Sequence, residues 1–198
     1  METGNLYFVG RNYVEHAKEL NNEVPTKPLI FTKPISVISK DGKLPYPKHS
    51  KEVHFEGEMV FKYNKGGKFL VSCGIDYTAR DIQADIKKKG WPWFEAKCFQ
   101  GSAVIGNIFV EVSKDDLAKL EIETYLNGEL RQKGNYGQKI FKVDFLFEYL
   151  SSLVPLYDGD LLFTGTPAGV GKVSPGDKLR VVLKLNGNIV SEVVSEVI

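Results

Sequence analysis

The chain has 198 residues, of which 42% are hydrophobic, so it can build one substantial core and lacks the composition of a disordered or fibrous protein. Lys and Arg number 26 against 25 Asp and Glu, and a net charge of +1 gives no general field that would attract nucleic acid or an anionic membrane. No apolar run approaches the roughly 18 residues of a membrane span, and the amino end lacks a signal-peptide pattern. We therefore expect a cytoplasmic protein whose partner is a small molecule.

Residues 1–198 are expected to form a single domain. The first strand is predicted over residues 6–9, and a short helix follows through Leu20 and ends at Asn21-Asn22. Five prolines break residues 24–50 into short extended pieces. Strands are then predicted over 53–63 and 69–75. The period changes to that of a helix over 78–89, with Thr78 as its N-cap and Gly90 as its terminator.

The carboxyl half reads mainly as strands, over 103–113, 119–126 and 160–163, with one short helix over 144–153. Asn127-Gly128 and Asn186-Gly187 each lie between strand-like runs and predict hairpins. The strands do not alternate regularly with helices, which indicates an α+β fold with a rolled, mainly β core. The two cysteines, Cys73 and Cys98, have no metal or redox spacing, so we expect them to be reduced and give them no role.

Two glutamates stand out in the predicted strand 53–63. Alternation places the apolar side chains of Val53, Phe55, Met59, Phe61 and Tyr63 on one face, and Glu56 and Glu58 on the other. Their Cα atoms would lie about 6.6 Å apart, which lets both carboxylates converge on one divalent cation. Gly57 between them leaves room for close approach. The alternative is that both acids lie on the solvated face of an amphipathic strand.

Other polar residues extend this candidate metal site. Asp76 ends the next strand, and Arg80 and Gln83 follow at offsets of four and seven, so the three project to one side. A solvated helix surface would give the same pattern for Arg80 and Gln83. Three carboxylates offer oxygen ligands, which suit Mg²⁺, Mn²⁺ or Ca²⁺ and do not suit zinc.

Two further patterns have both a functional and a plain interpretation. His16 and Glu19 are three residues apart in the first helix, so the carboxylate could orient an imidazole that acts as a general base, or the two could form a surface pair. The glycine-rich bend Thr164-Gly165-Thr166-Pro167 could bring backbone N–H groups close to an anion, or be a simple turn. It lacks the lysine and spacing of a P-loop.

The order of the motifs resembles that of the fumarylacetoacetate hydrolase superfamily, and most closely its short acylpyruvate hydrolase and oxaloacetate decarboxylase branch. The matching segments span nearly the whole chain: Gly10-Arg11-Asn12-Tyr13 with His16 and Glu19, Phe31-Thr32-Lys33-Pro34, Glu56-Gly57-Glu58, Asp76 with Arg80 and Gln83, Ala96-Lys97-Cys98-Phe99, Asn127-Gly128-Glu129, Gly159-Asp160 and Thr164-Gly165-Thr166-Pro167.

This resemblance implies a mixed, mainly antiparallel β-roll with few short helices, usually a homodimer, that binds Mg²⁺ or Mn²⁺ through Glu56, Glu58 and Asp76. It also implies that His16 and Glu19 activate a water from a lid over residues 10–22. The remaining matched groups, which would hold the oxyanion and carboxylate of a 2-keto acid, are Lys97, Arg80, Gln83 and Thr166. One departure lies at Asn135 to Phe141, where the superfamily usually has a threonine or serine followed shortly by methionine. Here a bulky Tyr136 and a charged Lys139 could reshape the pocket wall, which bears on the identity of the substrate more than on the chemistry.

The leading expectation is therefore hydrolysis of a carbon–carbon bond in a 3-acylpyruvate, giving pyruvate and a carboxylic acid. Decarboxylation of oxaloacetate, or keto-enol isomerisation of a related dioate, would use the same metal and the same enolate. A third alternative is a protein that binds keto acids without chemistry, against which the presence of both His16 and Glu19 argues.

Overall fold

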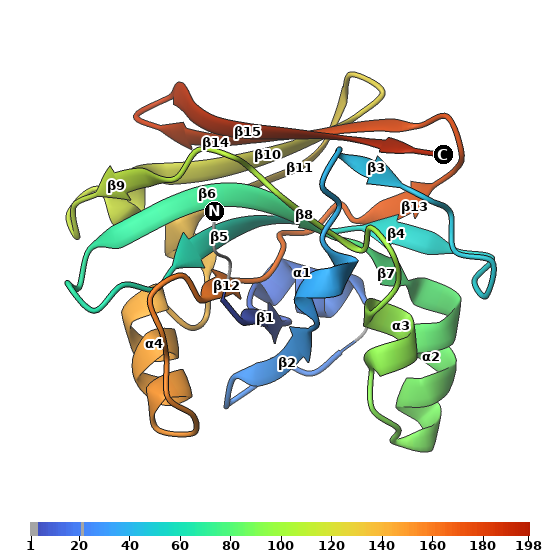
Figure 1. Ribbon diagram of the computed structural model, residues 1–198, viewed down its shortest axis with the longest axis horizontal. Helices are drawn as coiled ribbons and strands as arrows, with labels where there is room; N and C mark the ends of the chain where they lie inside the picture. Colours follow the sequence, from blue (N-terminus) through green and yellow to red (C-terminus); the bar gives the residue numbers. More distant parts are fainter. Residues whose placement is uncertain (1–3, 21) are drawn as a thin grey trace.

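The computed structural model describes residues 4–20 and 22–198, and this part of the chain is built mainly of strands. Figure 1 shows a sheet of long strands lying over a second, curled sheet, with the helices on the far side of the curled one. The helices are α1 (Val14–Glu19), α2 (Arg80–Lys89), α3 (Phe94–Lys97) and α4 (Val143–Ser151), with 3-10 turns at Ile35–Val37, Leu117–Lys119 and Tyr136–Gln138.

The strands of the described residues pair into three sheets. Their bounds are β1 (Leu6–Gly10), β2 (Leu29–Lys33), β3 (Lys43–Leu44), β4 (Val53–Phe55), β5 (Gly57–Lys62), β6 (Phe69–Asp76), β7 (Thr78–Ala79), β8 (Ala103–Ile105), β9 (Val110–Val112), β10 (Leu120–Leu126), β11 (Glu129–Asn135), β12 (Leu161–Phe163), β13 (Gly171–Val173), β14 (Lys178–Leu185) and β15 (Asn188–Val197).

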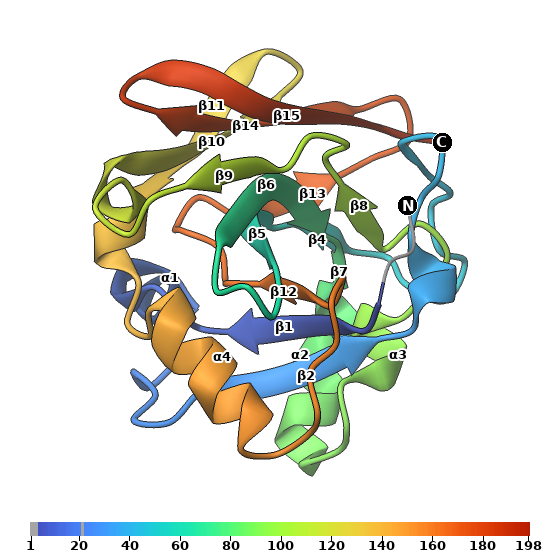
Figure 2. The same cartoon turned by 60° about the vertical axis from the view of Figure 1, so that its left-hand side comes forward.

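The curled sheet has the order β2-β1-β12-β5-β6-β8, with β9 also paired to β6, and Figure 2 shows how it rolls. The long-stranded sheet has the order β11-β10-β14-β15-β3, and a small third sheet is β13-β4-β7. Among the described pairs, β1 with β12 and β15 with β3 run parallel, and the others are antiparallel. The prediction of an α+β, mixed and mainly antiparallel β-roll is confirmed.

The main core lies between the curled sheet and the long-stranded sheet. Phe55, Met59 and Phe61 are fully buried there, as the alternation predicts, and they pack in one cluster with side chains of β10 and β14. Gly57 lies at a close approach of the two sheets, since a Cβ atom at this position would lie 2.0 Å from the hydroxyl oxygen of Thr124 on β10. A larger residue at position 57 would push the two sheets apart.

The predicted strand over 53–63 is in fact two strands, which is a correction. The strand partners change at Glu56: β4 pairs with β13 and β7, whereas β5 pairs with β12 and β6. The backbone carbonyl of Glu56 still accepts a hydrogen bond of 2.8 Å from the N–H of Asp76. The break therefore leaves these two acidic residues side by side.

The helix predictions hold in outline. Gly90 ends α2 in the left-handed region at φ 69°, as predicted, but Thr78 is not the N-cap, because it lies in β7 and Ala79 caps the helix instead. The predicted end of the first helix at Asn21 lies outside the described residues. No helix in the described part of the chain is long and apolar enough to cross a membrane.

Turn chemistry in the carboxyl half agrees with the sequence. Asn127-Gly128 and Asn186-Gly187 join β10 to β11 and β14 to β15, with all four residues at positive φ, as a two-residue hairpin requires. The predicted strand over 103–113 is divided into β8 and β9. Cys73 and Cys98 are free thiols, as predicted.

Candidate active site

Three carboxylates meet at the edge where β5 and β6 pair. Glu56, Glu58 and Asp76 are only 6%, 2% and 1% exposed, and one oxygen from each lies within 4.8 Å of the others. Antiparallel pairing explains this, because Glu58 is opposite Gly74 and Asp76 therefore lies beside Glu56. The alternative of a solvated strand face is wrong for both glutamates.

The three acids have different electrostatic surroundings. Burial, together with the negative charges of Asp76 and Glu56, raises the pKa of Glu58 well above its usual value. Burial also opposes ionisation of Glu56, but the charges of Lys97 and Arg80 outweigh it and hold the pKa of Glu56 well below the usual value. Glu58 accepts a 2.6 Å hydrogen bond from the N–H of Gly165, and among the described residues no lysine, arginine or histidine forms a salt bridge with it. A bound cation would relieve this repulsion.

Two buried lysines lie against the same acids. Lys97 Nζ is 2.9 Å from Glu56 Oε2, 2.6 Å from Asp76 Oδ2 and 2.6 Å from the hydroxyl of Thr78. Lys33 Nζ is 2.6 Å from Asp76 Oδ1 and also donates to two backbone carbonyls. Lys97 was predicted to act in the site, and it lies between two of the three predicted ligands.

The donor set fits a hard divalent cation. Asp76 Oδ1 is buried and, despite its ion pair with Lys33, accepts no hydrogen bond of good geometry, so a lone pair remains for another partner. All three candidate ligands are carboxylates, which favours Mg²⁺ or Mn²⁺ over softer metals. The residues present are therefore suited to hold the metal that the sequence predicts.

Helix α2 brings two more predicted residues into the pocket. Arg80 pairs with Glu56 through Nη2, donates to Gln83 Oε1 at 2.6 Å through Nη1, and faces His54 Nδ1 at 3.4 Å through Nε. Gln83 is buried and lines the pocket together with Asp76 and Arg80. The prediction that these three project to one side is confirmed, and a solvated helix surface is excluded for Gln83.

The two residues of the predicted dyad lie on α1, and the histidine lines the pocket. His16 is 4% exposed and lines the pocket, and its Nδ1 is 3.4 Å from Glu19 Oε2. Glu19 also accepts a 3.0 Å hydrogen bond from the N–H of Gly169. Burial raises the pKa of Glu19, but the hydrogen bonds from His16 and Gly169 outweigh it, so the net shift is downward. The alternative of a surface ion pair is wrong for His16, because its side chain is buried.

The glycine-rich bend closes one wall. One of its backbone N–H groups approaches a carboxyl group: the N–H of Gly165, a residue at φ +87°, donates to Glu58 Oε2. Thr166 lines the pocket, but its hydroxyl donates to the carbonyl of Gly57 at 2.9 Å and accepts from Gln132 Nε2 at 2.7 Å. A substrate contact by Thr166 stays a prediction.

The two residues that depart from the superfamily pattern, Tyr136 and Lys139, do not line the pocket, so they do not form its wall. Tyr136 packs in the main core, where its hydroxyl accepts a 3.1 Å hydrogen bond from the N–H of Val143. Lys139 is buried behind the bend and donates to the carbonyl of Thr164 at 3.1 Å. Tyr136 begins the Tyr136–Gln138 turn and Lys139 directly follows it, and both side chains are buried.

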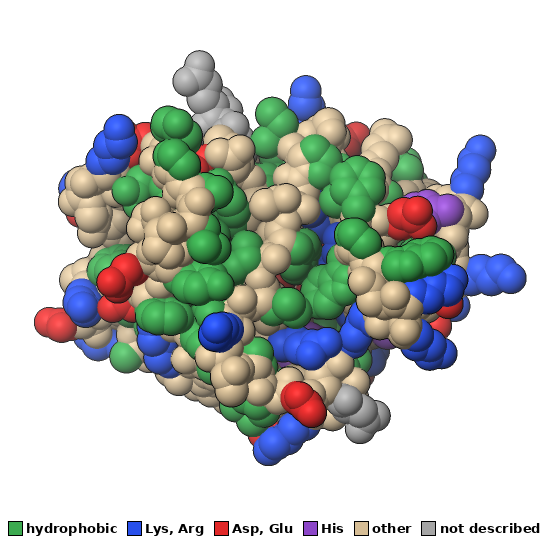
Figure 3. Space-filling model, turned by 90° about the horizontal axis from the view of Figure 1, so that it is seen from below, with side chains coloured by type: hydrophobic (Ala, Val, Ile, Leu, Met, Phe, Trp, Pro, Cys, Tyr) green, Lys and Arg blue, Asp and Glu red, His purple; other side chains and the backbone are tan. Residues whose placement is uncertain are grey.

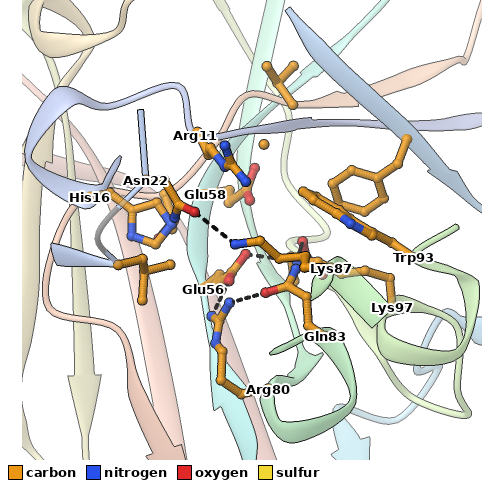
Figure 4. Close-up of a pocket in the computed structure, with 16 residues that line it drawn as sticks. Arg11, His16, Asn22, Glu56, Glu58, Arg80, Gln83, Lys87, Trp93 and Lys97 are labelled. Carbon is orange, nitrogen blue, oxygen red and sulfur yellow. Dashed lines mark hydrogen bonds and ion pairs between the residues drawn. The ribbon is translucent and has the colours of Figure 1, made fainter. Parts of the chain in front are cut away.

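The pocket also contains residues to which the sequence analysis gave no role. Figure 4 shows them around the acids: Arg11, Asn22, Lys87 and Trp93. Lys87 lies four residues after Gln83 on α2, so its spacing on the helix was a usable signal. The sequence analysis did not use this spacing, because three lysines in the last turn of a helix are also explained by their favourable interaction with the helix dipole.

Comparisons with known proteins agree with this geometry. The family model described as "Fumarylacetoacetate (FAA) hydrolase C-terminal" matches residues 5–194. The chain is 36% identical to an oxaloacetate decarboxylase of Dictyostelium discoideum over 90% of this chain and 88% of the relative, and 38% identical to the oxaloacetate tautomerase FAHD1 of Arabidopsis thaliana over 88% and 83%. A fumarylpyruvate hydrolase of Pseudomonas aeruginosa, solved in complex with Mn²⁺ and pyruvate, superposes with a TM-score of 0.85 at 32% identity, covering 99% of this chain and 90% of the other. The chain belongs to the fumarylacetoacetate hydrolase family.

Proposed function

We propose that the protein is a Mg²⁺- or Mn²⁺-dependent hydrolase that cleaves a carbon–carbon bond in a 3-acylpyruvate. The observation that carries the proposal is that His16, whose ring contacts the carboxylate of Glu19, lines the same pocket as the three buried carboxylates. A likeness to a fumarylpyruvate hydrolase in complex with Mn²⁺ and pyruvate supports both the metal and the keto-acid ligand.

Glu56, Glu58 and Asp76 would hold the ion. When bound, a divalent ion supplies Lewis-acid polarisation of the keto-acid end and stabilises developing negative charge by several kcal/mol. The ammonium group of Lys97, already within 3 Å of two carboxylates, would add positive charge where the leaving carbanion forms. Arg80 and Gln83, which hold each other, would orient the carboxylate of the substrate.

The chain's own residues would carry the proton transfers. His16 Nε2 would take a proton from a water while the water oxygen attacks the acyl carbonyl carbon. Glu19, at Nδ1, would fix the orientation of the ring and stabilise the imidazolium that forms. The bond from the acyl carbon to the pyruvate methylene then breaks, and its electron pair leaves as the pyruvate enolate. Protonation of that enolate carbon gives pyruvate, and the acyl part leaves as a carboxylic acid.

Loss of the enol absorbance of acetylpyruvate in the presence of Mg²⁺ tests this directly. We expect His16→Ala to lower kcat by two to four orders of magnitude, as loss of a general base does. His49→Ala removes an exposed histidine whose ring bonds the carbonyl of Glu95 and is the matched control. Full activity in His16→Ala would reject the hydrolytic role of the dyad.

A second candidate is tautomerisation or decarboxylation of oxaloacetate. The observation that favours it is the identity of 36% and 38% to relatives named as an oxaloacetate decarboxylase and an oxaloacetate tautomerase. These reactions need the enolate but no attacking water. If His16→Ala loses acetylpyruvate cleavage and keeps oxaloacetate turnover, one site serves both reactions. Binding of oxalate without turnover of any 2-keto acid would instead favour a binding protein.

We also propose that the protein forms a homodimer. Ile35, Phe94 and Tyr157 are large apolar side chains, each more than half exposed, and they line one surface hollow. Hydrophobic side chains also gather on the face seen in Figure 3. Light scattering on the purified protein should give twice the chain mass, and Phe94→Glu should shift it towards the monomer. A cytosolic location stays a prediction.

A further inference from the structure

The guanidinium of Arg80 has three hydrogen-bond partners, and one of them lies outside the pocket. Nη2 pairs with Glu56 and Nη1 donates to Gln83, and both of these residues line the pocket (Figure 4). The third donor, Nε, is 3.4 Å from Nδ1 of His54, which is not among the lining residues. The side chain of His54 is 15% exposed and comes from β4. The imidazole therefore reaches the pocket through Arg80.

These contacts specify which ring nitrogen of His54 carries a hydrogen. Nε of Arg80 bears an N–H group and cannot accept, so Nδ1 of the imidazole is the acceptor and carries no hydrogen. The other ring nitrogen, Nε2, is 2.8 Å from Oε1 of Glu52. A carboxylate accepts, so Nε2 carries the hydrogen and donates it. Glu52 thus favours the one neutral tautomer that can accept from Arg80.

The backbone places these residues together independently of their side chains. The N–H of Arg80, at the start of α2, donates to the carbonyl of Glu52 at 2.7 Å. His54 lies opposite Thr78 where β4 pairs with β7, two residues before α2 begins. The start of α2 is therefore attached to the segment that carries Glu52 and His54, and the side-chain contacts form on a framework that is already fixed.

The contact with His54 leaves donors of Arg80 for a ligand. A guanidinium has more N–H groups than its contacts with Glu56, Gln83 and His54 use, and the remaining ones are on Nη1 and Nη2. A carboxylate is bound best by parallel N–H groups of a guanidinium whose plane is fixed. His54, at Nε, fixes the end of the guanidinium opposite to these donors.

We propose that His54, held in one tautomer by Glu52, is a positioning residue that orients the guanidinium of Arg80 towards the carboxylate of the keto-acid ligand. This inference rests on the proposed function, in which Arg80 and Gln83 orient that carboxylate. His54 itself does not touch the ligand. Its loss should therefore weaken binding of the carboxylate and leave the bond-breaking steps nearly unchanged.

Long-range ¹H–¹⁵N spectra of the metal-free protein test the tautomer, whatever the protein catalyses. The chain has three histidines, so the signals of His54 are those that disappear in His54→Leu. We expect hydrogen on Nε2 and none on Nδ1 in neutral buffer. A ring with hydrogen on Nδ1 could not accept from Arg80 and would overturn the inference.

Calorimetry with pyruvate on the Mn²⁺-saturated protein tests the positioning. We expect His54→Leu to weaken pyruvate binding about tenfold, as loss of one hydrogen bond to a charged group does. His54→Asn should recover most of the affinity, because its amide oxygen takes the place of Nδ1 and can accept from Arg80. His49→Leu removes an exposed histidine whose ring bonds the carbonyl of Glu95, and this matched control should bind pyruvate as the wild type does.

A merely structural role for His54 predicts a different pattern. Equal weakening in His54→Leu and His54→Asn, or no weakening in His54→Leu, would overturn the inference. Thermal unfolding checks that each variant is folded. If His54→Leu does not fold, His54→Gln replaces it, because its amide lies one carbon further out and does not take the place of Nδ1.

Turnover of acetylpyruvate separates this inference from the proposed function. We expect His54→Leu to raise KM and to leave kcat nearly unchanged. A wild type that cleaves acetylpyruvate, with the same KM in His54→Leu, would keep the function and lose the inference. A wild type that only binds pyruvate, with the loss in His54→Leu and the recovery in His54→Asn, would keep the inference and lose the hydrolytic function. A wild type that does neither would overturn both.

Discussion

Lys139 gives a prediction that can be worked out from the structure. Its side chain is 3% exposed, donates to the carbonyl of Thr164 and lies over the ring of Tyr13. Burial lowers its pKa from 10.5 to about 7; Glu58 opposes the shift and Lys142 adds to it. Because the folded pKa lies below the unfolded one, the unfolded chain binds more protons between these two values. The stability of the wild type should therefore rise with pH through this window, and the destabilisation should be complete below pH 7.

Replacing Lys139 with methionine, the residue typical of the superfamily near this position, removes this dependence while keeping the length of the side chain. Lowering the pKa from 10.5 to about 7 corresponds to about 5 kcal/mol over the full window, of which about 3 kcal/mol falls between pH 6 and pH 9. Denaturant unfolding of the metal-free proteins at both pH values gives the difference directly. Lys139→Met should be the more stable protein at pH 6, with an advantage that shrinks by about 3 kcal/mol at pH 9.

Titration of other groups cancels in this comparison because both proteins contain them. Lys51→Met removes an exposed lysine and controls for the general loss of one positive charge. A difference between wild type and Lys139→Met that stays constant from pH 6 to pH 9 would refute the reasoning, since it would mean that the buried ammonium is not destabilised.

Three other results are expected. Gly165→Ala should destabilise the fold by about 1 to 3 kcal/mol in thermal unfolding, because φ is +87° there and the new Cβ would lie 2.7 Å from that of Asn12; unchanged stability would contradict this. Metal binding should release protons and strengthen with rising pH, because the pKa of Glu58 is raised and its proton must leave; calorimetry in buffers of different ionisation enthalpy measures this, and pH-independent affinity would count against it. Tyr136→Phe should cost about 1 to 2 kcal/mol, by leaving the N–H of Val143 unpaired, and leave kcat unchanged; a large fall in kcat would place Tyr136 in the site after all.

Local patterns predicted local structure well. The Asn-Gly hairpins and the glycine that ends α2 follow from the backbone preferences of a few neighbouring residues, and the structure has them as expected. The break at Glu56 was missed because it depends on which sheets the two halves of the segment join, and that is decided by distant residues such as Lys172 on β13. Thr78 was wrongly predicted to cap the helix, because its hydroxyl accepts a hydrogen bond from Lys97 and not from the helix terminus.

The candidate site was predictable where its residues lie close together in the sequence or on one helix face. Glu56, Glu58, Arg80 and Gln83 are of this kind. Lys139 was considered for the pocket wall because the order of motifs in the sequence does not distinguish residues that line a pocket from residues packed behind them. Arg11 was given no separate role because its left-handed backbone, at φ +56°, does not follow from a turn motif in the sequence.

The central claim is that Glu56, Glu58 and Asp76 hold a divalent ion on which the chemistry depends. Its most direct test is acetylpyruvate turnover by chelator-treated protein as Mg²⁺ is added back, for the wild type and for Asp76→Asn. We expect no activity before addition, saturable recovery in the wild type, and no recovery in a folded Asp76→Asn protein. Full activity of the wild type in excess chelator, or equal recovery in Asp76→Asn, would contradict the claim.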